Sequence, residues 1–347
     1  MSSRITADSE TMISFSDSLA EWLSIENVSI GLTCYQTGQL LLIGMEPTGA
    51  VSLSEANFGQ AMGLHCDPDR IYLSTFNMVW RLENILGKGE LSDGKHDRLY
   101  IPRNAHTVGD IDIHELRLDQ HGNPVFVNTC YSCLATLDPV HSFHPIWRPL
   151  FISELVPEHR CHLNGMCVVD GAPIYVTAIS HADEPDGWRG HRAETGVLVD
   201  VTTNEIVVHG LSMPHSPRMY SGSLWIVESG RGHLLQIDST TYEREDIAFC
   251  PGFLRGLDFH DGFAVVGMSL GRDAGFAGLA MEETLKRREL TPWCGVQIID
   301  ILRGEVAAWI RFEGKIRELF EVCIIRGVRC PKVLDPMEGA RVITPGQ

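Results

Sequence analysis

The sequence predicts an all-β protein built as a six-bladed β-propeller, and two repeating patterns carry this prediction. A tight turn followed by a short apolar run recurs at Asp69-Arg70, His121-Gly122, Asp170-Gly171, Ser221-Gly222 and Asp261-Gly262. A later apolar run ends on an acidic turn residue at Asp138, Asp200, Asp238 and Asp300. Each period of roughly 40 to 50 residues therefore holds about four strands, which is the size of a propeller blade.

The stretch from Leu211 to Asp238 shows one unit of the repeat in compact form. It contains a loop with His215 and Arg218, followed by short apolar runs that are separated at Ser221-Gly222 and at Gly230. Short apolar runs interrupted by Gly, Ser and Asp are typical of hairpins, because these residues tolerate the dihedral angles of tight turns. This unit is the fourth of five complete blades.

The sixth blade has to be assembled from both ends of the chain. The run ELFEVCII near the C-terminus supplies its innermost strand, and VSIGLTCY, QLLLIGM and AVSLSEANF near the N-terminus supply the other three. We expect a single propeller domain over residues 21–335. Residues 1–20 are expected to be partly disordered or to form a short helix, and residues 336–347 to form a tail. An insertion in blade five, around residues 271–293, contains a segment with the pattern of an amphipathic helix.

Composition limits the partners of this protein. The 347 residues include 45 acidic and 28 basic side chains, a formal net charge of −17, which argues against nucleic acid or an anionic membrane as the main partner. The N-terminus lacks the apolar core of a signal peptide, and the apolar runs are too short to cross a bilayer. The ten cysteines, mostly within strand runs, predict buried free thiols in the cytoplasm.

The loops of the predicted blades differ between the two faces of the propeller. On one face the turns are short and plain. On the other face lie the segments NAHTVGD, EHRCHLNG, MPHSPR and PGFLRG together with both long insertions. Function is usually carried by loops that a rigid scaffold holds in place, so the sequence predicts a site on this second face.

Three histidines, His106, His162 and His215, are predicted to reach the axis from consecutive blades. Imidazoles that converge on a channel suit a divalent metal such as zinc, iron or manganese. Asp112, which alternates with Asp110 and His114, would add an oxygen ligand or orient a histidine. The alternative is that these histidines form hydrogen bonds between neighbouring blades. The sequence lacks a metal motif of the HExxH type.

Several other side chains are candidates for binding a substrate at the same face. Arg218 and Arg255 occupy similar loops, and a guanidinium binds carboxylate or phosphate through two parallel hydrogen bonds. An anionic small molecule is therefore the predicted substrate, although ion pairs between blades would explain the same arginines. The remaining candidates are Arg231 for substrate, Asn164 for substrate or a loop cap, Glu318 as ligand or base, and Trp188 within a lid-like insertion.

Other motifs are weaker or missing. Cys130 and Cys133 have the spacing of a redox pair, but they lie at a turn between strands rather than at a helix start. The sequence contains no P-loop, no dinucleotide fingerprint before a helix, no nucleophile elbow and no kinase motif set. Nucleotide-dependent chemistry is therefore disfavoured.

The strings DRLYIPRNAHTVGDIDIHEL, FVNTCYSCLATLD, HRCHLNGM, YVTAISHAD, GLSMPHSPR, CPGFLRGL and ELFEV resemble a bacterial family of unknown function with CHLNG and MPHSPR signatures. The resemblance runs from about Trp22 to Pro331. It implies kinship rather than chemistry, and its motifs coincide with His106, Asp112, His162, Asn164, His215, Arg218 and Arg255. The sequence departs from the pattern at Glu194-Thr195-Gly196.

The sequence thus leads to a hypothesis of a metal-dependent enzyme of hydrolase, lactonase or lyase type. The expected architecture is similar to that of propeller lactonases and lyases, which is an analogy at the level of fold. His106, His162 and His215 would hold the ion, Asp112 or Glu318 would move a proton, and Arg218 with Arg255 would hold an anionic group. A metal-dependent oxygenase and a non-catalytic propeller that binds a ligand or partner are the alternatives. The oligomeric state is left open.

Overall fold

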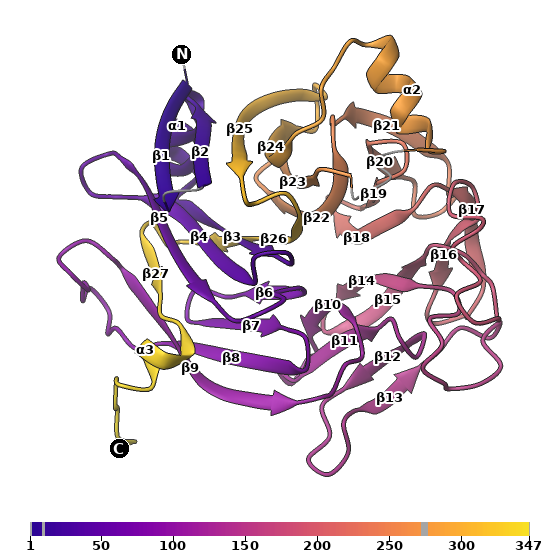
Figure 1. Ribbon diagram of the computed structural model, residues 1–347, viewed down its shortest axis with the longest axis horizontal. Coiled ribbons are helices and arrows are strands. Elements are labelled where there is room, and N and C mark those ends of the chain that lie inside the picture. The colour runs from indigo at the N-terminus through magenta and orange to yellow at the C-terminus, as the bar shows by residue number, and fades with distance from the viewer. Residues whose placement is uncertain (1, 9–10, 272–276, 347) are drawn as a thin grey trace.

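Six β-sheets are arranged around a central axis in the computed structural model, which describes residues 2–8, 11–271 and 277–346 (Figure 1). Each sheet contains the four strands of one blade, and two of the sheets carry additional strands at their outer edge. This arrangement confirms the predicted fold class.

The strands of each blade are given from the axis outward. Blade one comprises β6 (Leu64–Cys66), β7 (Arg70–Ser74), β8 (Met78–Asn84) and β9 (Arg98–Thr107). Blade two comprises β10 (Ile113–Leu118), β11 (Pro124–Asn128), β12 (Cys133–Thr136) and β13 (His144–Trp147). Blade three comprises β14 (Leu163–Val169), β15 (Ala172–Ala178), β16 (Gly196–Asp200) and β17 (Ile206–Leu211). Blade four comprises β18 (Pro214–Tyr220), β19 (Ser223–Glu228), β20 (His233–Ile237) and β21 (Arg244–Phe249). Blade five comprises β22 (Phe253–His260), β23 (Phe263–Ser269), β24 (Cys294–Asp300) and β25 (Glu305–Gly314).

The sixth blade closes the ring by joining the two ends of the chain, as predicted. Its innermost strand is β26 (Leu319–Arg326), which pairs with β3 (Val28–Cys34), followed by β4 (Gln39–Met45) and β5 (Val51–Asn57). The register places Ile324 opposite Ile30, and both side chains are buried. Closure therefore combines a backbone ladder with apolar packing, because both strands are apolar on the faces that meet neighbouring blades.

The N-terminal segment differs from the expectation of a partly disordered or helical stretch. Strands β1 (Ser2–Asp8) and β2 (Thr11–Ser16) extend blade five, with β2 antiparallel to β25. Ile13 and Phe15 alternate along β2 and are buried in the core next to β25. Alternation with a period of two marks a half-buried strand, so the local pattern favours a strand here. The helix that does form, α1 (Ser18–Glu26), packs Leu19, Trp22 and Leu23 into the same core.

The chain ends beside blade one rather than at the closing blade. Strand β27 (Pro331–Val333) runs parallel to the outer strand β9, and the short helix α3 (Pro336–Gly339) follows it. Figure 1 shows both elements, in yellow, alongside β9. The tail predicted for residues 336–347 thus includes one turn of helix.

Two insertions project from the face on which the inner strands begin. One connects β15 to β16, and the other connects β23 to β24 and contains α2 (Ala280–Arg287). The predicted helix in blade five is therefore present. No helix in the described part of the chain is long and apolar enough to span a membrane. All ten cysteines are free thiols, including Cys130 and Cys133.

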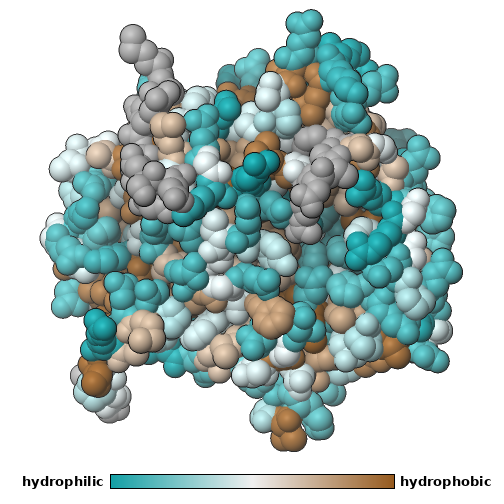
Figure 2. Space-filling view, viewed as in Figure 1, coloured by the Kyte–Doolittle hydropathy of each residue, from teal (hydrophilic) through white to brown (hydrophobic). Residues whose placement is uncertain are grey.

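The outer surface of the propeller is polar on the face shown in Figure 2. Apolar side chains, in brown, are scattered among hydrophilic ones. The apolar side chains gather instead in clusters between neighbouring sheets, such as the cluster that joins blade five to the closing blade.

Candidate functional site

The inner strands of the six blades are tied to one another by a repeated hydrogen bond. We call the contact between two neighbouring blades a junction. At five of the six junctions, a side-chain hydroxyl near the end of the second strand of one blade, counted from the axis, donates to a backbone carbonyl near the start of the innermost strand of the next blade. These bonds join Thr33 to Met62 (2.6 Å), Ser74 to Ile113 (3.2 Å), Thr129 to Leu163 (2.6 Å), Ser229 to Leu254 (2.6 Å) and Ser269 to Leu319 (2.8 Å). At the sixth junction the Asn164 side chain donates to the Pro214 carbonyl at 2.9 Å. The six acceptors therefore mark equivalent positions of the inner strands.

These acceptors divide the residues around the axis into two layers. We call the residues just before them the entrance tier: Ala61, Asp112, His162, Met213, Phe253 and Glu318. We call the residues just after them the inner tier: Gly63, His114, Asn164, His215, Arg255 and Phe320. Blades two to six carry a bulge or irregularity at this level of the inner strand, which aims the adjoining side chains at the axis.

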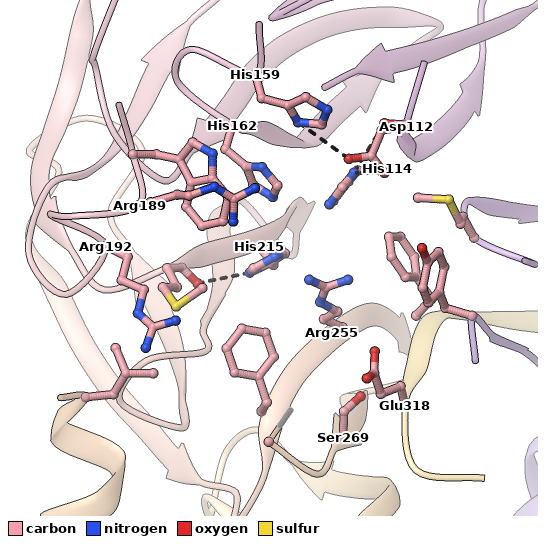
Figure 3. A pocket seen from close by; sticks show the side chains of 18 of the residues that line it. Asp112, His114, His159, His162, Arg189, Arg192, His215, Arg255, Ser269 and Glu318 are labelled. Atoms are coloured by element: carbon pink, nitrogen blue, oxygen red, sulfur yellow. Dashed lines mark hydrogen bonds and ion pairs between the residues drawn. The ribbon is translucent and has the colours of Figure 1, made fainter. Parts of the chain in front are cut away.

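Most of the two tiers lines one pocket with a cavity volume of about 340 Å³. The wall includes Asp112, His162, Met213, Phe253 and Glu318 from the entrance tier and His114, His215, Arg255 and Phe320 from the inner tier. Figure 3 shows His114, His162, His215 and Arg255 directed toward the middle of this pocket. The guanidinium of Arg255 lies over the rings of Phe320 (4.7 Å) and Phe253 (5.5 Å). The pocket therefore combines imidazoles and a guanidinium on an aromatic wall.

His215 is held in one orientation by the blade junction itself. Its Nδ1 lies 2.8 Å from the Ser229 hydroxyl and 3.0 Å from the Met213 carbonyl. Because the Ser229 hydroxyl donates its proton to Leu254, it has to accept from Nδ1–H. The proton thus resides on Nδ1, and Nε2 keeps its lone pair. This Nε2 is buried and has no hydrogen-bond partner among the described residues.

His114 repeats this arrangement two blades away. Its Nδ1 lies 2.9 Å from the hydroxyl of Thr129, which donates to the Leu163 carbonyl. The backbone carbonyl and a carboxylate oxygen of Asp112 lie 3.2 Å and 3.3 Å from the same nitrogen. Only acceptors surround Nδ1, so it carries a proton here as well. Both imidazoles therefore use Nδ1 for support and turn the opposite edge of the ring toward the pocket.

Burial keeps two of the pocket histidines neutral. Burial is the main reason that the pKa of His215 lies well below its usual value, and the nearby charge of Arg255 lowers it further. Burial also holds the pKa of His162 well below its usual value, with His114 adding to the effect. At neutral pH these rings are therefore hydrogen-bond acceptors or bases rather than cations.

Asp112 connects two histidines at the entrance. Its carboxylate contacts His114 and, at 3.8 Å, Nδ1 of His159. Burial acts to raise the pKa of Asp112, but the interactions with His114, His162 and His159 outweigh it and leave the pKa well below the usual value. Asp112 has a φ of 55°, and His162 and Met213 at the same tier have φ values of 52° and 51°. Left-handed backbone at non-glycine residues is costly and is concentrated at functional sites.

The insertion after β15 forms part of the pocket mouth. The Trp188 ring lies 4.2 Å from the His162 ring, centroid to centroid, and Arg189 lies 4.6 Å above Trp188. Arg189 also pairs with Asp186 at 2.9 Å, and Arg192 donates to the Ala277 carbonyl at 3.2 Å. Trp188, Arg189 and Arg192 all line the pocket, so the insertion predicted to be lid-like does border the site.

A buried ion cluster lies further along the inner strands. Arg218 contacts Glu115 and, at 3.5 Å, Glu321. Arg117 contacts the same two carboxylates at 2.8 Å and 3.7 Å. Burial raises the pKa of Glu115 to about 7 and that of Glu321 to about 8, while the charge of Arg117 opposes both shifts. Arg218, predicted to hold an anionic group of the substrate, is therefore one of the four side chains that join blades here and is not part of the pocket wall.

Three other predicted site residues lie away from the pocket or support it from behind. His106 belongs to the outer strand β9, where it pairs with Val79, and it borders a separate cavity between blades one and two. Strand β9 continues to Thr107, so the loop into β10 is shorter than the sequence suggested. Arg231 forms ion pairs with Glu228 and Asp246 at 2.7 Å each. Asn164 is committed to the blade junction and accepts from Thr177 at 2.8 Å.

The pocket also contains residues that the sequence analysis did not select. The sequence pattern indicates His114 only as a neighbour of Asp112, and it does not single out His159, Arg192, Phe253 or Phe320. Aligning the six inner strands on the carbonyl that accepts the junction bond would have found the inner-tier members. No signal in the sequence would have found His159 or Arg192, because both belong to irregular segments.

The donors of the pocket fit a metal site only in part. The unpartnered Nε2 of His215 and Nδ1 of His162 are chemically suited to a divalent cation. Nevertheless, the described residues contain no group of three or more His, Cys, Asp or Glu side chains that could hold an ion. The predicted trio of His106, His162 and His215 is not assembled, because His106 lies on β9.

Fold and site together define a six-bladed propeller with a polar axial pocket. The chain belongs to the family described as "Domain of unknown function (DUF4915)", which it matches over residues 17–334, and this confirms the resemblance to an uncharacterised family. No curated protein matches the sequence.

The solved structures that this chain resembles include one chain of a protein complex and two lyases. A chain of a nidogen/laminin complex is 11% identical, with a TM-score of 0.53 over 87% of this chain and 99% of that chain. Virginiamycin B lyase from Staphylococcus aureus is 12% identical (TM-score 0.41; 68% and 76% covered), and a streptogramin B lyase is 10% identical (0.41; 81% and 78%). The first likeness shows the propeller fold alone, and we draw nothing from the other two.

Proposed function

We propose that this protein is an enzyme that binds an anionic small molecule in the axial pocket and uses His215 as a general base, in a reaction of lyase or hydrolase type. The observation that carries the proposal is the orientation of His215. Its Nδ1–H is held by Ser229 and Met213, and its buried Nε2 has no partner among the described residues. A general base needs such an unprotonated nitrogen within reach of the substrate.

Arg255 supplies the second element, because it occupies the inner tier of the adjacent blade. Its guanidinium is suited to a carboxylate or phosphate. Since its charge lowers the pKa of His215, an anion bound to Arg255 would offset that charge and make His215 a stronger base. Substrate binding would thereby activate the base.

Asp112 and Glu318 were both predicted to move a proton, and the pocket suggests different roles for them. The low pKa and the contact with His114 make Asp112 a positioning residue that orients this imidazole. Glu318 lines the pocket wall and stays the proposed proton acceptor or donor on the side of the closing blade.

A divalent metal ion, zinc, iron or manganese, stays a separate proposal. Of the predicted ligands His106, His162 and His215, only His162 and His215 line the pocket, so their unpartnered nitrogens would contribute to holding it, and a bound ion would polarise a carbonyl or activate water. We assign no step to it, because the described residues contain no assembled group of three ligands. Elemental analysis of protein purified without a histidine tag or chelator tests this proposal.

The experiment that tests the function compares wild-type protein with His215→Asn. The asparagine amide retains a donor near Ser229 but has no counterpart of Nε2. A panel of hydroxy acids and their lactones in D₂O is followed by NMR for product or for deuterium incorporation. Turnover is expected with wild-type protein and a fall of about 10²–10⁴-fold in the variant, the usual contribution of a general base. Each reaction is run with EDTA and with added Zn²⁺ or Mn²⁺.

Two outcomes contradict the proposal. Turnover that survives in His215→Asn removes His215 as the base. Tight binding of panel members without turnover by the wild-type protein, with or without metal, favours a propeller that only binds its ligand. Metal-dependent consumption of dioxygen would instead favour the oxygenase alternative.

A further inference from the structure

Polar atoms of the pocket wall that lack hydrogen-bond partners indicate which groups a ligand would need. Three buried nitrogen atoms of its wall have no hydrogen-bond partner among the described residues: Nδ1 of His162, Nε1 of Trp188 and Nε2 of His215. Buried polar groups without partners cost free energy, so native structures rarely keep them unless a ligand or water satisfies them. Because these three atoms border one pocket, a single ligand bound there could satisfy them.

The chemistry of two of these atoms defines what the ligand presents to them. The indole Nε1–H of Trp188 only donates, so the ligand has an acceptor at the mouth. The Nε2 of His215 carries no proton, so the ligand has a donor, such as a hydroxyl, deeper in the pocket. A ligand that is anionic throughout would leave His215 unsatisfied.

Positive charge is found at two levels of the same pocket. Arg255 is in the inner tier, whereas Arg189 and Arg192 come from the insertion at the mouth. Figure 3 shows the two groups on different sides of the space between His162 and His215. The pocket wall thus has three arginines and two carboxylates in a protein with a net charge of −17. One of those carboxylates, Asp112, contacts His114 and His159.

The insertion is anchored so that its arginines stay at the mouth. Trp188 packs against His162, and together with Ala193 it packs on the cluster formed by Leu279, Met281 and Leu285 near α2. Arg189 lies over the Trp188 ring. The two insertions therefore support each other, and packing holds Trp188 and Ala193, which flank the two arginines in sequence.

We propose that the ligand of this pocket carries two anionic groups on either side of a hydroxyl-bearing carbon. This inference rests on the proposed function and names its substrate class: small hydroxylated dicarboxylates or phosphorylated hydroxy acids. Arg255 binds one anionic group and Arg189 with Arg192 binds the other, which also accepts from Trp188 Nε1–H. The hydroxyl donates to His215 Nε2. A cavity of about 340 Å³ accommodates a molecule of this size.

Binding of matched anions tests the inference without requiring turnover. Isothermal titration calorimetry compares lactate with malate and glycerate with 3-phosphoglycerate, so that each pair differs by one anionic group. The variants are Arg189→Gln combined with Arg192→Gln, Arg255→Gln and Trp188→Phe. Arg81→Gln is the control, because Arg81 borders the separate cavity at blade one and its loss changes the net charge by one unit, as Arg255→Gln does.

In each pair we call the ligand with two anionic groups the dianion and the ligand with one the monoanion. Wild-type protein is expected to bind the dianion of at least one pair about tenfold or more tightly than the monoanion, which is the effect of one charge-assisted contact. The double variant is expected to lose this preference. Arg255→Gln should weaken the binding of both members of the pair, whereas Arg81→Gln should bind both as the wild-type protein does. Trp188→Phe should lower the affinity for the ligand with two anionic groups and leave the affinity for the ligand with one anionic group unchanged.

Equal affinity for both members of every pair, no binding of any dianion, or a preference that persists in the double variant would overturn the inference. The proposed function fails differently. If the dianion preference is present but no panel member turns over, only the catalytic proposal is lost. If a monoanion turns over in a His215-dependent manner without any dianion preference, only the substrate class is lost.

Discussion

The burial of neutral His215 predicts a specific dependence of stability on pH. In the unfolded chain a histidine has a pKa of about 6.5, whereas in the folded protein the pKa of His215 lies well below this value. As the pH falls through about 6.5, this imidazole therefore becomes protonated in the unfolded state but stays neutral in the folded state. Stability is lost on acidification, and it is fully present only above the unfolded pKa.

The magnitude follows from proton linkage. Between pH 7.5 and pH 5.5, protonation of one histidine in the unfolded state alone lowers the free energy of unfolding by about 1.4 kcal/mol. His215→Asn removes this term, so relative to wild type the variant should gain about 1.4 kcal/mol over the same pH interval. His162→Asn is expected to show the same sign, since the pKa of His162 is also lowered by burial.

The comparison between variants is essential, because other groups act in the same pH range. Glu115 and Glu321 have raised pKa values of about 7 and about 8, so they stabilise the folded state as the pH falls and oppose the histidines. The pKa of Asp112 is lowered in the folded protein, so its contribution to the stability of the folded state is lost only at more acidic pH. The difference between wild type and His215→Asn cancels these contributions.

Urea unfolding at pH 7.5, 6.5 and 5.5 measures the effect. The control is Phe253→Leu, which alters the ring packed 5.8 Å from His215 but keeps the imidazole and should run parallel to wild type. If the curves of His215→Asn and wild type stay parallel across this range, the folded imidazole binds its proton as easily as the unfolded one. The assignment of a neutral base would then be wrong.

Two further predictions concern the junctions between blades. Ser229→Ala removes a fully buried hydroxyl that bonds both Leu254 and His215, so we expect a loss of about 1–3 kcal/mol in the free energy of unfolding. Ser74→Ala should cost a similar amount, but only Ser229→Ala should also reduce turnover, which a pH-rate profile would show. Arg218→Met leaves two buried glutamates without one of their cations and should destabilise the protein by about 3–5 kcal/mol, measured by urea unfolding. Soluble, wild-type-like stability of Arg218→Met would contradict the role of the ion cluster.

The fold could be predicted from local patterns because each blade repeats the same physical solution. Alternating apolar residues bounded by glycine and aspartate turns recur along the chain, and the C-terminal strand ELFEVCII matches the three N-terminal strands in apolar character. The N-terminal strand β2 was missed although Ile13 and Phe15 alternate, because a terminal segment is easily assumed to be mobile. Its partner β25 is almost 300 residues away in the sequence, so the residues around β2 give no indication of this pairing.

The site was predicted less completely, and two of the errors share one cause. His162, His215, Asp112, Arg255, Glu318 and Trp188 do line the pocket. His106 and Arg218 do not, because a shift of a few residues moves a side chain between the loop, the outer strand and the interior of a propeller. Strand alternation makes such assignments sensitive to register.

The number of blades, the closure of the ring and the face that carries the histidine- and arginine-bearing loops could be read from the periodic pattern of apolar and turn residues. Which histidine edges are turned toward the axis could not be read from that pattern. That choice depends on the hydroxyls of Ser229 and Thr129, which donate to carbonyls of the next blade and thereby orient the imidazoles. A contact between blades has no signature in either strand alone.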